Sequence, residues 1–505
     1  MEKSSKQNIQ KIQEGAELVF KLWFYLYVIL STCNLTYGTH IVSWCMWPML
    51  VLGAVLVLAR FIRIKDYIRM PLLWILILMF ASYLFTMATN LQYESHKGLV
   101  TMVFWLFYFG LLYPVRTGDD TGRVKKEFTL MAVVHIGYAL LMTLTSLGMM
   151  AVGYSSSYID TNNGNYEVVS GFCYGRLWGT FQDPNLGAIV CCTAIALSIY
   201  FLMQTSRKWL KALLSLFILL FVVYIGFSDS RNGLLSLGIG MTAFVFFQLF
   251  YKERSWKKQW LHLAAALAVG IVCFLAPQGI KYSYNAVVSQ AQQKEQQKTQ
   301  EETVKKEKEA AVEKDAVQKD TAEKNTDTTK KAAVTPTPKP KKPAEKVERN
   351  YSMEGDISNR RFDIWKSAVE VALSRPITGT SFSGIVPYAK ENLPETYIVN
   401  NDHWDYSTMD NEVLNVFVSQ GFPGLIILIV LVVCAVKFVF SRIWKLGQKD
   451  FWRASVLLLC IVMLCVSAMF QATMFYQNSP DANMFWMFLG YLVFMLNKEV
   501  KAETK

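Results

Sequence analysis

Long apolar stretches recur along almost the whole chain of 505 residues, of which 53% are hydrophobic. Each stretch has about 17–25 residues, the length that an α-helix needs to cross the hydrocarbon core of a bilayer. The pattern therefore predicts an all-α integral membrane protein with about twelve transmembrane helices. The predicted spans are 18–34, 41–59, 71–90, 98–114, 128–150, 186–203, 210–226, 233–250, 260–277, 413–440, 452–470 and 482–496.

Basic residues fall in every second loop between these predicted spans. The basic loops follow spans two, four, six, eight and ten, and both ends of the chain are basic as well. Because Lys and Arg accumulate on the cytoplasmic side of membrane proteins, we predict that both termini are cytoplasmic. The same distribution accounts for the net charge of +12, so no nucleic-acid partner is expected.

Two loops on the opposite, outer side are long. The first covers 151–185, and the second covers 278–412. The second loop separates spans one to nine with their short loops (1–277) from spans ten to twelve and the tail (413–505). Within it, 290–349 is of low complexity, with almost no large apolar side chains. Such a segment cannot bury a core, so we expect disorder or at most a solvated helix, acting as a spacer or a cell-wall tether.

Order is expected to return over 356–411, as a cap on the outer mouth of the helical bundle. Apolar residues recur there at intervals of three and four, namely Phe362, Trp365, Val369, Ala372 and Leu373. This spacing predicts an amphipathic helix that ends before Pro376, with these residues on its apolar face.

Four arginines break the trend of the other basic residues because they lie on the outer side, namely Arg176, Arg231, Arg360 and Arg361. A guanidinium at the edge of the hydrocarbon is costly, and its planar fork can bind two phosphate oxygens at once. The placement predicts a site for a phosphorylated, lipid-linked ligand. For each arginine the alternative is pairing with lipid headgroups or with a neighbouring carboxylate.

Side chains that could accept a proton lie near the starts of spans six and ten. They are Asp183, His403, Asp405, Asp410 and Glu412. Asp410 abuts span ten, where desolvation would raise the basicity of a carboxylate. Asp183 could equally cap the helix that follows it. No Cys or His spacing typical of a metal site occurs in the sequence, so neither a metal nor a cofactor is expected.

Four sequence blocks, taken in order, resemble those of the bacterial O-antigen ligase and polymerase superfamily, which are membrane glycosyltransferases. The blocks are Arg176-Leu-Trp-Gly-Thr-Phe-Gln-Asp-Pro-Asn-Leu-Gly187, Ser228-Asp-Ser-Arg-Asn-Gly233, Arg361-Phe-Asp-Ile-Trp365 with Pro376-Ile-Thr-Gly379, and Asp410-Asn411 with Gly421-Phe-Pro-Gly424. The arginines implied to hold the diphosphate of a polyprenyl-linked donor are Arg176, Arg231, and Arg361 in preference to Arg360. The residues implied to support the motifs or the sugar are Asp183, Asn185, Trp365 and Asn411.

Ligases of this superfamily usually carry a His at the first position of the last block, where this chain has Asp410. The Asp-Asn form resembles the polymerase branch, which joins oligosaccharide repeat units carried on a polyprenyl diphosphate such as undecaprenyl diphosphate. The resemblance thus implies a polysaccharide polymerase at the outer face of the bacterial plasma membrane, making capsule, O-antigen or wall polysaccharide. Asp410 or His403 would act as the base.

The resemblance further implies that the anomeric configuration inverts without a metal. Expected partners are the lipid-linked oligosaccharide and membrane lipid, with a flippase and a chain-length regulator as candidates. The first alternative is a ligase that moves the glycan to a wall polymer, a lipid or a protein. The second is a transporter or flippase of lipid-linked sugars.

Overall fold

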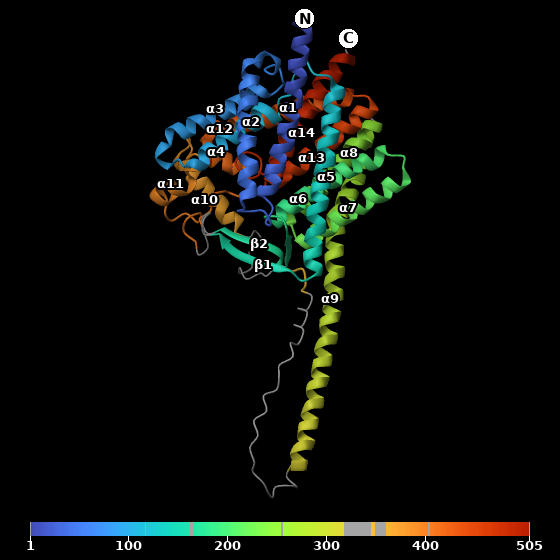
Figure 1. Cartoon of the computed structure of the whole chain (residues 1–505). Helices are drawn as coiled ribbons and strands as arrows, with labels where there is room; N and C mark the ends of the chain where they lie inside the picture. The colour runs from blue at the N-terminus through green and yellow to red at the C-terminus, as the bar shows by residue number, and fades with distance from the viewer. Residues whose placement is uncertain are drawn as a thin grey trace.

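The computed structural model describes residues 2–116, 118–160, 166–253, 256–317, 345–348, 360–401 and 405–503. The chain is mostly helical (Figure 1). Its α-helices are α1 (Glu2–Ser31), α2 (His40–Ile62), α3 (Leu73–Thr89), α4 (His96–Phe107), α5 (Thr121–Ala151), α6 (Pro184–Gln204), α7 (Lys208–Ser228), α8 (Arg231–Lys252), α9 (Gln259–Val317), α10 (Arg361–Ser374), α11 (Ile385–Asn392), α12 (Glu412–Arg442), α13 (Gln448–Ala468) and α14 (Pro480–Glu503).

Each apolar stretch found in the sequence coincides with a helix of the bundle, with α4 extended by a π-helical turn at Tyr108–Leu112. Within the described ranges, eight helices are long and apolar enough to cross a membrane, namely α2, α5, α6, α7, α8, α9, α12 and α13. The helices α3 and α4 are apolar but shorter. A mostly helical membrane protein is therefore supported, while twelve spans stay a prediction.

The helix α6 lies at the centre of the bundle. In its most apolar window 78% of the residues are buried, against 17% for the peripheral helices α2 and α12. It packs against α5, α7, α8 and α13. The N-terminus of α6 is consequently held from several sides, and the Asp183 and Asn185 of the first block lie at this N-terminus.

The first outer loop contains a small sheet, so the prediction of an all-α protein was incomplete. Strands β1 (Ser155–Asp160), β2 (Tyr166–Cys173) and β3 (Arg176–Gly179) form an antiparallel sheet in the order β1-β2-β3. Cys173 pairs with Arg176, and the two residues between them both have positive φ (55° and 66°). Such a two-residue turn matches the twist of a hairpin. It fixes Arg176 at the first position of β3.

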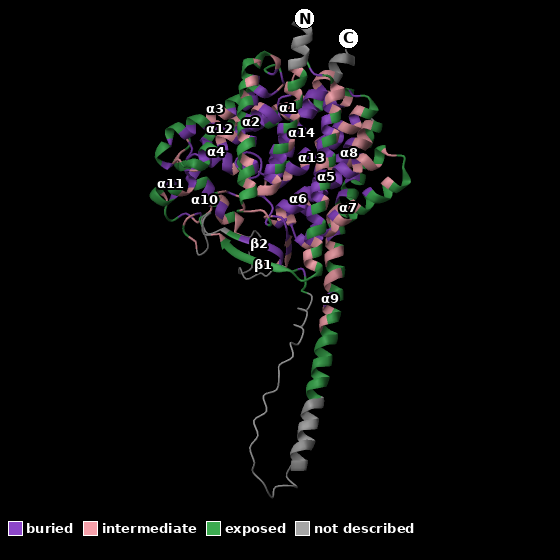
Figure 2. Cartoon of the chain, in the orientation of Figure 1, coloured by how far each residue is buried: buried purple, intermediate pink, exposed green. Residues whose placement is uncertain are grey.

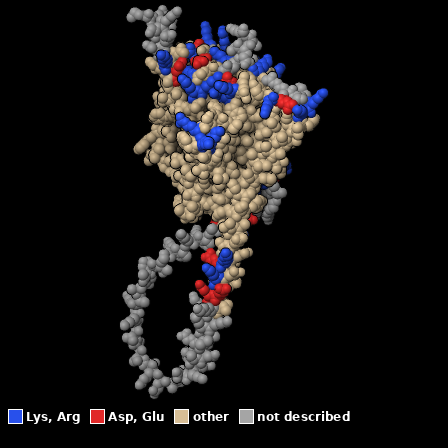
Figure 3. Space-filling view, turned by 90° about the vertical axis from the view of Figure 1, so that its right-hand side faces the viewer, with Lys and Arg blue, Asp and Glu red and all other residues tan. Residues whose placement is uncertain are grey.

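The two termini lie together at one end of the molecule, and the sheet lies at the other end with α10 and α11 (Figure 1). Figure 3 shows Lys and Arg gathered near the terminal end, above a broad band with few charges. This separation agrees with the orientation expected from the positive-inside rule. Cytoplasmic termini stay a prediction.

The helix α9 continues far beyond the bundle, and its outer part is exposed (Figure 2). The start of the low-complexity segment is therefore helical as far as Val317, and the expected boundary at 277/278 falls inside α9. This stretch is rich in Ala, Glu, Gln and Lys, which favour helix. Residues 318–344 lie outside the described residues.

Asn285 of α9 forms two hydrogen bonds with the far end of the same segment. Its Nδ2 donates to the carbonyl oxygen of Val347 (2.9 Å), and the Val347 backbone N–H donates to Asn285 Oδ1 (2.8 Å). Val347 is fully buried. These hydrogen bonds thus hold Val347 beside α9.

The helix α10 forms where an amphipathic helix was predicted and ends before Pro376, but it buries a different face. Phe362 and Leu373 are exposed, whereas Ile364, Ala368 and Val371 are buried. These buried residues pack with residues of α11 and α12 in one apolar cluster. The predicted apolar face was thus wrong at Phe362, Val369 and Leu373, which are exposed, and right at Ala372, which is buried in this cluster.

Candidate active site

Arg176 joins the first two sequence blocks. Its Nε donates to the carbonyl oxygen of Ser228 (2.8 Å), and its Nη2 donates to Asn185 Oδ1 (3.3 Å). Ser230 Oγ donates to the same Asn185 oxygen (2.8 Å). The amide oxygen of Asn185 therefore ties the arginine of the first block to the Ser-Asp-Ser-Arg turn of the second.

Arg176 is part-buried, and charged groups of both signs lie near it. Burial lowers the pKa of Arg176, and the nearby carboxylates of Asp183 and Asp229 act in the opposite direction. The charge of Arg231, the first residue of α8, adds to the lowering of this pKa. The two arginines predicted from the sequence thus lie near enough for their charges to interact.

In three of the four sequence blocks, a side chain caps the start of a helix. Asp183 caps α6 by accepting from the backbone N–H of Asn185 (2.7 Å), so the capping alternative for Asp183 is what the structure shows. Ser230 caps α8, and Asn411 caps α12. Helix N-termini carry partial positive charge and favour anions. The caps hold Arg231, Asp410 and their neighbours at these positive ends.

Arg361 and Asp410 form an ion pair. Arg361 Nε lies 3.6 Å from Asp410 Oδ2, and Arg361 Nη2 donates to the carbonyl oxygen of Phe470 (3.2 Å). Asp410 adopts a left-handed backbone (φ 48°) and its side chain is 39% exposed. Burial raises the pKa of Asp410 to about 6, Arg361 lowers it, and Asp183 adds to the rise. A carboxylate of this pKa is a better proton acceptor than an ordinary aspartate.

The structure distinguishes the two arginines at the start of α10. Arg360 has a positive φ of 63° and its Nη1 lies 3.8 Å from the carboxylate of Asp363 on the same helix. Arg361 instead faces Asp410. Trp365 Nε1 donates to the carbonyl oxygen of Met409 (3.1 Å), which fixes the chain just before Asp410.

The glycines of the third and fourth blocks bring these two blocks together. Gly379 has φ +60° and a Cβ there would lie 2.3 Å from the carbonyl oxygen of Ser419. Gly421 breaks the helical geometry inside α12 (φ 63°), and the Phe422 N–H then donates to the carbonyl oxygen of Pro376 (2.7 Å). These contacts hold residues 376–379, which follow α10, against α12, whose N-cap is Asn411.

The other acid–base candidates are placed elsewhere or are not described. Asp405 pairs with Lys390 at 2.7 Å, both part-exposed. Glu412 is buried and accepts from the backbone N–H groups of Met474 (3.1 Å) and Phe475 (3.0 Å). His403 lies outside the described residues.

Two contacting residues were missed in the sequence. Gln471, in the loop between α13 and α14, donates from Nε2 to Asp183 Oδ1 (3.2 Å) and accepts from Asn232 Nδ2 (3.1 Å). Lys281 of α9 lies 2.9 Å from the carboxylate of Asp229. The signal for Gln471 was a cluster of amide and hydroxyl side chains between two apolar runs on the outer side.

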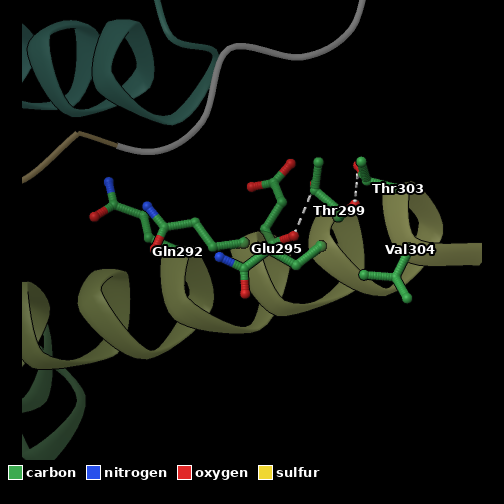
Figure 4. A pocket seen from close by; sticks show the side chains of 7 residues that line it. Gln292, Glu295, Thr299, Thr303 and Val304 are labelled. Atoms are coloured by element: carbon green, nitrogen blue, oxygen red, sulfur yellow. Dashed lines mark hydrogen bonds between the residues drawn. The ribbon is translucent and has the colours of Figure 1, made fainter. Parts of the chain in front are cut away.

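A hollow along the outer part of α9 does not belong to this group of residues. Figure 4 shows side chains that line it, all from one helix: Gln292, Glu295, Gln296, Thr299, Gln300, Thr303 and Val304. It contains none of the candidate site residues. The site is therefore the group at the ends of α6, α8, α10 and α12.

Residues 216–429 match the family model described as O-antigen ligase. This region is thus similar to the O-antigen ligase family. The match confirms the superfamily predicted from the motifs, and it includes the blocks of Arg231, Arg361 and Asp410. It begins after Arg176, which is nevertheless bonded to the matched residue Ser228. No curated protein matched the chain. The match supports a membrane glycosyltransferase of the ligase or polymerase type that acts on lipid-linked oligosaccharide.

Proposed function

We propose that this chain polymerises oligosaccharide repeat units linked to a polyprenyl diphosphate, at the outer face of the bacterial plasma membrane. The observation that carries the proposal is the Arg361–Asp410 ion pair beside the group of Arg176 and Arg231. Guanidinium groups stabilise a leaving diphosphate, and a carboxylate of raised pKa accepts a proton. The two requirements of glycosyl transfer thus meet in one site.

In the proposed reaction, Arg176, Arg231 and Arg361 hold the diphosphate of the donor chain. The carboxylate of Asp410 removes the proton of the acceptor hydroxyl, whose oxygen then attacks the anomeric carbon. The bond between that carbon and the diphosphate oxygen breaks, and the diphosphate leaves with the electron pair. Attack from the opposite face inverts the anomeric configuration. We assign positioning roles to Asp183, Asn185, Trp365 and Asn411, which hold helix starts or the loop before Asp410.

The proposal also fixes an orientation. Twelve spans with cytoplasmic termini put the sheet, α10 and the site outside the membrane, where lipid-linked repeat units would be delivered by a flippase. A chain-length regulator is a further candidate partner. Arg360 has less support as a phosphate ligand than Arg361, because Arg360 contacts Asp363 of its own helix, whereas Arg361 contacts Asp410 and Phe470 of the candidate site.

The test is to incubate the purified protein with lipid-linked repeat units and to separate the products by size. A ladder of longer glycans is expected from the wild type, and a strongly reduced ladder from Arg176→Ala. Absence of extension by the wild type, with Arg176→Ala behaving identically, would overturn the polymerase proposal.

A ligase is the second candidate, favoured by the family description of residues 216–429. It would attach one finished glycan block to a wall polymer, a lipid or a protein. Product analysis separates the two, because a ligase adds a single block to a different acceptor. The transporter alternative gains no support from the family match.

A further inference from the structure

The loop between α13 and α14 contacts several parts of the candidate site. The carbonyl oxygen of Phe470 accepts from Arg361 Nη2 (3.2 Å), and that of Met469 accepts from Asn411 Nδ2 (3.2 Å). The side chain of Gln471 follows immediately. This loop lies after the end of the family match at residue 429 and carries none of the sequence blocks.

Both the nitrogen and the oxygen of the Gln471 side-chain amide form hydrogen bonds. Nε2 donates to Asp183 Oδ1 (3.2 Å), and Oε1 accepts from Asn232 Nδ2 (3.1 Å). An ionised carboxylate only accepts, and the amide NH₂ group of Asn232 only donates. The two partners therefore demand a donor and an acceptor on one flat side chain of this length. A glutamate cannot supply the donor, and an aliphatic side chain supplies neither.

The backbone that follows Gln471 is held in place by hydrogen bonds from side chains buried in the bundle. Glu412 is 3% exposed, and its two carboxylate oxygens accept from the N–H groups of Met474 and Phe475. Trp486 Nε1 donates to the carbonyl oxygen of Met474 (2.9 Å). A loop held in this way places Gln471 at one position between Asp183 and Asn232.

Asp183 and Asn232 belong to different halves of the donor group. Asp183 caps the helix that carries Asn185, and Asn185 holds Arg176. Asn232 follows Arg231 on α8. On the same loop, Phe470 holds Arg361. The loop thus connects the surroundings of three arginines that come from distant parts of the sequence.

We propose that Gln471 is a positioning residue of the transfer site, which holds Asp183 and Asn232 in register so that the three arginines face one donor diphosphate. The inference rests on the proposed function and deepens it. It predicts that Gln471 affects binding of the lipid diphosphate more than binding of the acceptor glycan. A role in folding alone would not produce this difference.

The experiment compares Gln471→Glu and Gln471→Met with Gln477→Glu in the full-length protein. Gln471→Glu replaces the donor to Asp183 by a like charge, and Gln471→Met removes both hydrogen bonds at similar length without a charge. Gln477 lies in the same loop but is exposed, so Gln477→Glu controls for the added charge. The KM for donor and acceptor, kcat, thermal unfolding and binding of sugar-free polyprenyl diphosphate are measured.

We expect the donor KM and the dissociation constant for polyprenyl diphosphate to rise about tenfold in Gln471→Glu, because the hydrogen bond to the charged Asp183 is lost and a like charge is placed beside it. A smaller rise in the same direction is expected in Gln471→Met, with the acceptor KM and the unfolding temperature close to those of Gln477→Glu. Unchanged diphosphate binding in both Gln471 variants, or a change matched by Gln477→Glu, would overturn the inference.

The two proposals fail separately. If the wild type extends no glycan but diphosphate binding still depends on Gln471, the polymerase proposal falls and the positioning role stands. If the wild type extends glycans and the Gln471 variants match Gln477→Glu, the positioning role falls and the polymerase proposal stands.

Discussion

The ion pair between Arg361 and Asp410 predicts how activity depends on pH. A base acts when it is deprotonated, so with a pKa of about 6 the activity should fall as the pH drops below 6. At pH 5 roughly one molecule in eleven carries the ionised carboxylate, so kcat/KM should be about a tenth of its plateau value. The charged groups that act on Asp410 are Arg361 and Asp183.

Replacing Arg361 by Gln removes the charge that opposes the rise of the Asp410 pKa. Two unit charges 3.6 Å apart interact by roughly 1 kcal/mol in a water-like dielectric, the suitable choice for a part-exposed side chain. This energy corresponds to roughly 0.8 of a pH unit. The acidic limb of the profile should therefore move upward from about pH 6 toward pH 7. The plateau should fall as well, because a diphosphate ligand is lost.

The assay is glycan extension by purified protein from pH 4.5 to pH 8, with the midpoint of the acidic limb as the readout. Arg360→Gln is the matched control, since Arg360 pairs with Asp363. It should leave the midpoint closer to the wild-type value. A wild-type profile that is flat between pH 5 and pH 7, or a midpoint in Arg361→Gln that stays put or moves down, would refute the assignment of Asp410 as the base.

Three further outcomes follow from the contacts. Arg176→Ala should reduce glycan extension in the ladder assay by roughly 10- to 100-fold, because a charged hydrogen-bonding group is lost. The unfolding temperature should change little. Deleting 296–343 and joining the ends by a short Gly-Ser linker should keep the rate of glycan extension within about twofold of the wild-type rate. The hydrogen bonds between Asn285 and Val347 already hold the two ends together, so the deleted residues are not needed for this. Gly379→Ala should destabilise the fold by roughly 1–3 kcal/mol, visible in thermal unfolding, because the added Cβ meets a backbone carbonyl and φ is positive.

The helices could be predicted because bilayer length and apolar composition leave few other structures open to a chain. The helix starts at Asp183 and Asn411 were also readable, since residues of this type accept hydrogen bonds from the first backbone N–H groups. The sequence blocks then marked Arg176, Arg231 and Arg361, and the structure places all three near the starts of α6, α8 and α10. Local chemistry accounts for this part of the prediction.

What failed depends on contacts between distant residues. The sheet was missed because its tight turn is Tyr174-Gly175, and Tyr is an unusual residue at a positive φ. The face of α10 was predicted only in part: Ala372 is buried as expected, but Phe362 is exposed and Ala368 packs in the cluster with α11 and α12 instead. Gln471 makes its contacts with residues more than 200 positions away, and no local pattern reports such a pairing.

The left-handed backbone of Asp410 restricts what evolution can place at this position. Most side chains are disfavoured there, whereas Asp, Asn and His tolerate a positive φ better than other residues that carry a side chain. Asp is found in this chain, whereas His is typical of the ligases in the superfamily that the sequence blocks resemble. A carboxylate and an imidazole can therefore be exchanged at 410 without rebuilding the loop, so under the proposed function one substitution would separate two kinds of proton acceptor on the same scaffold.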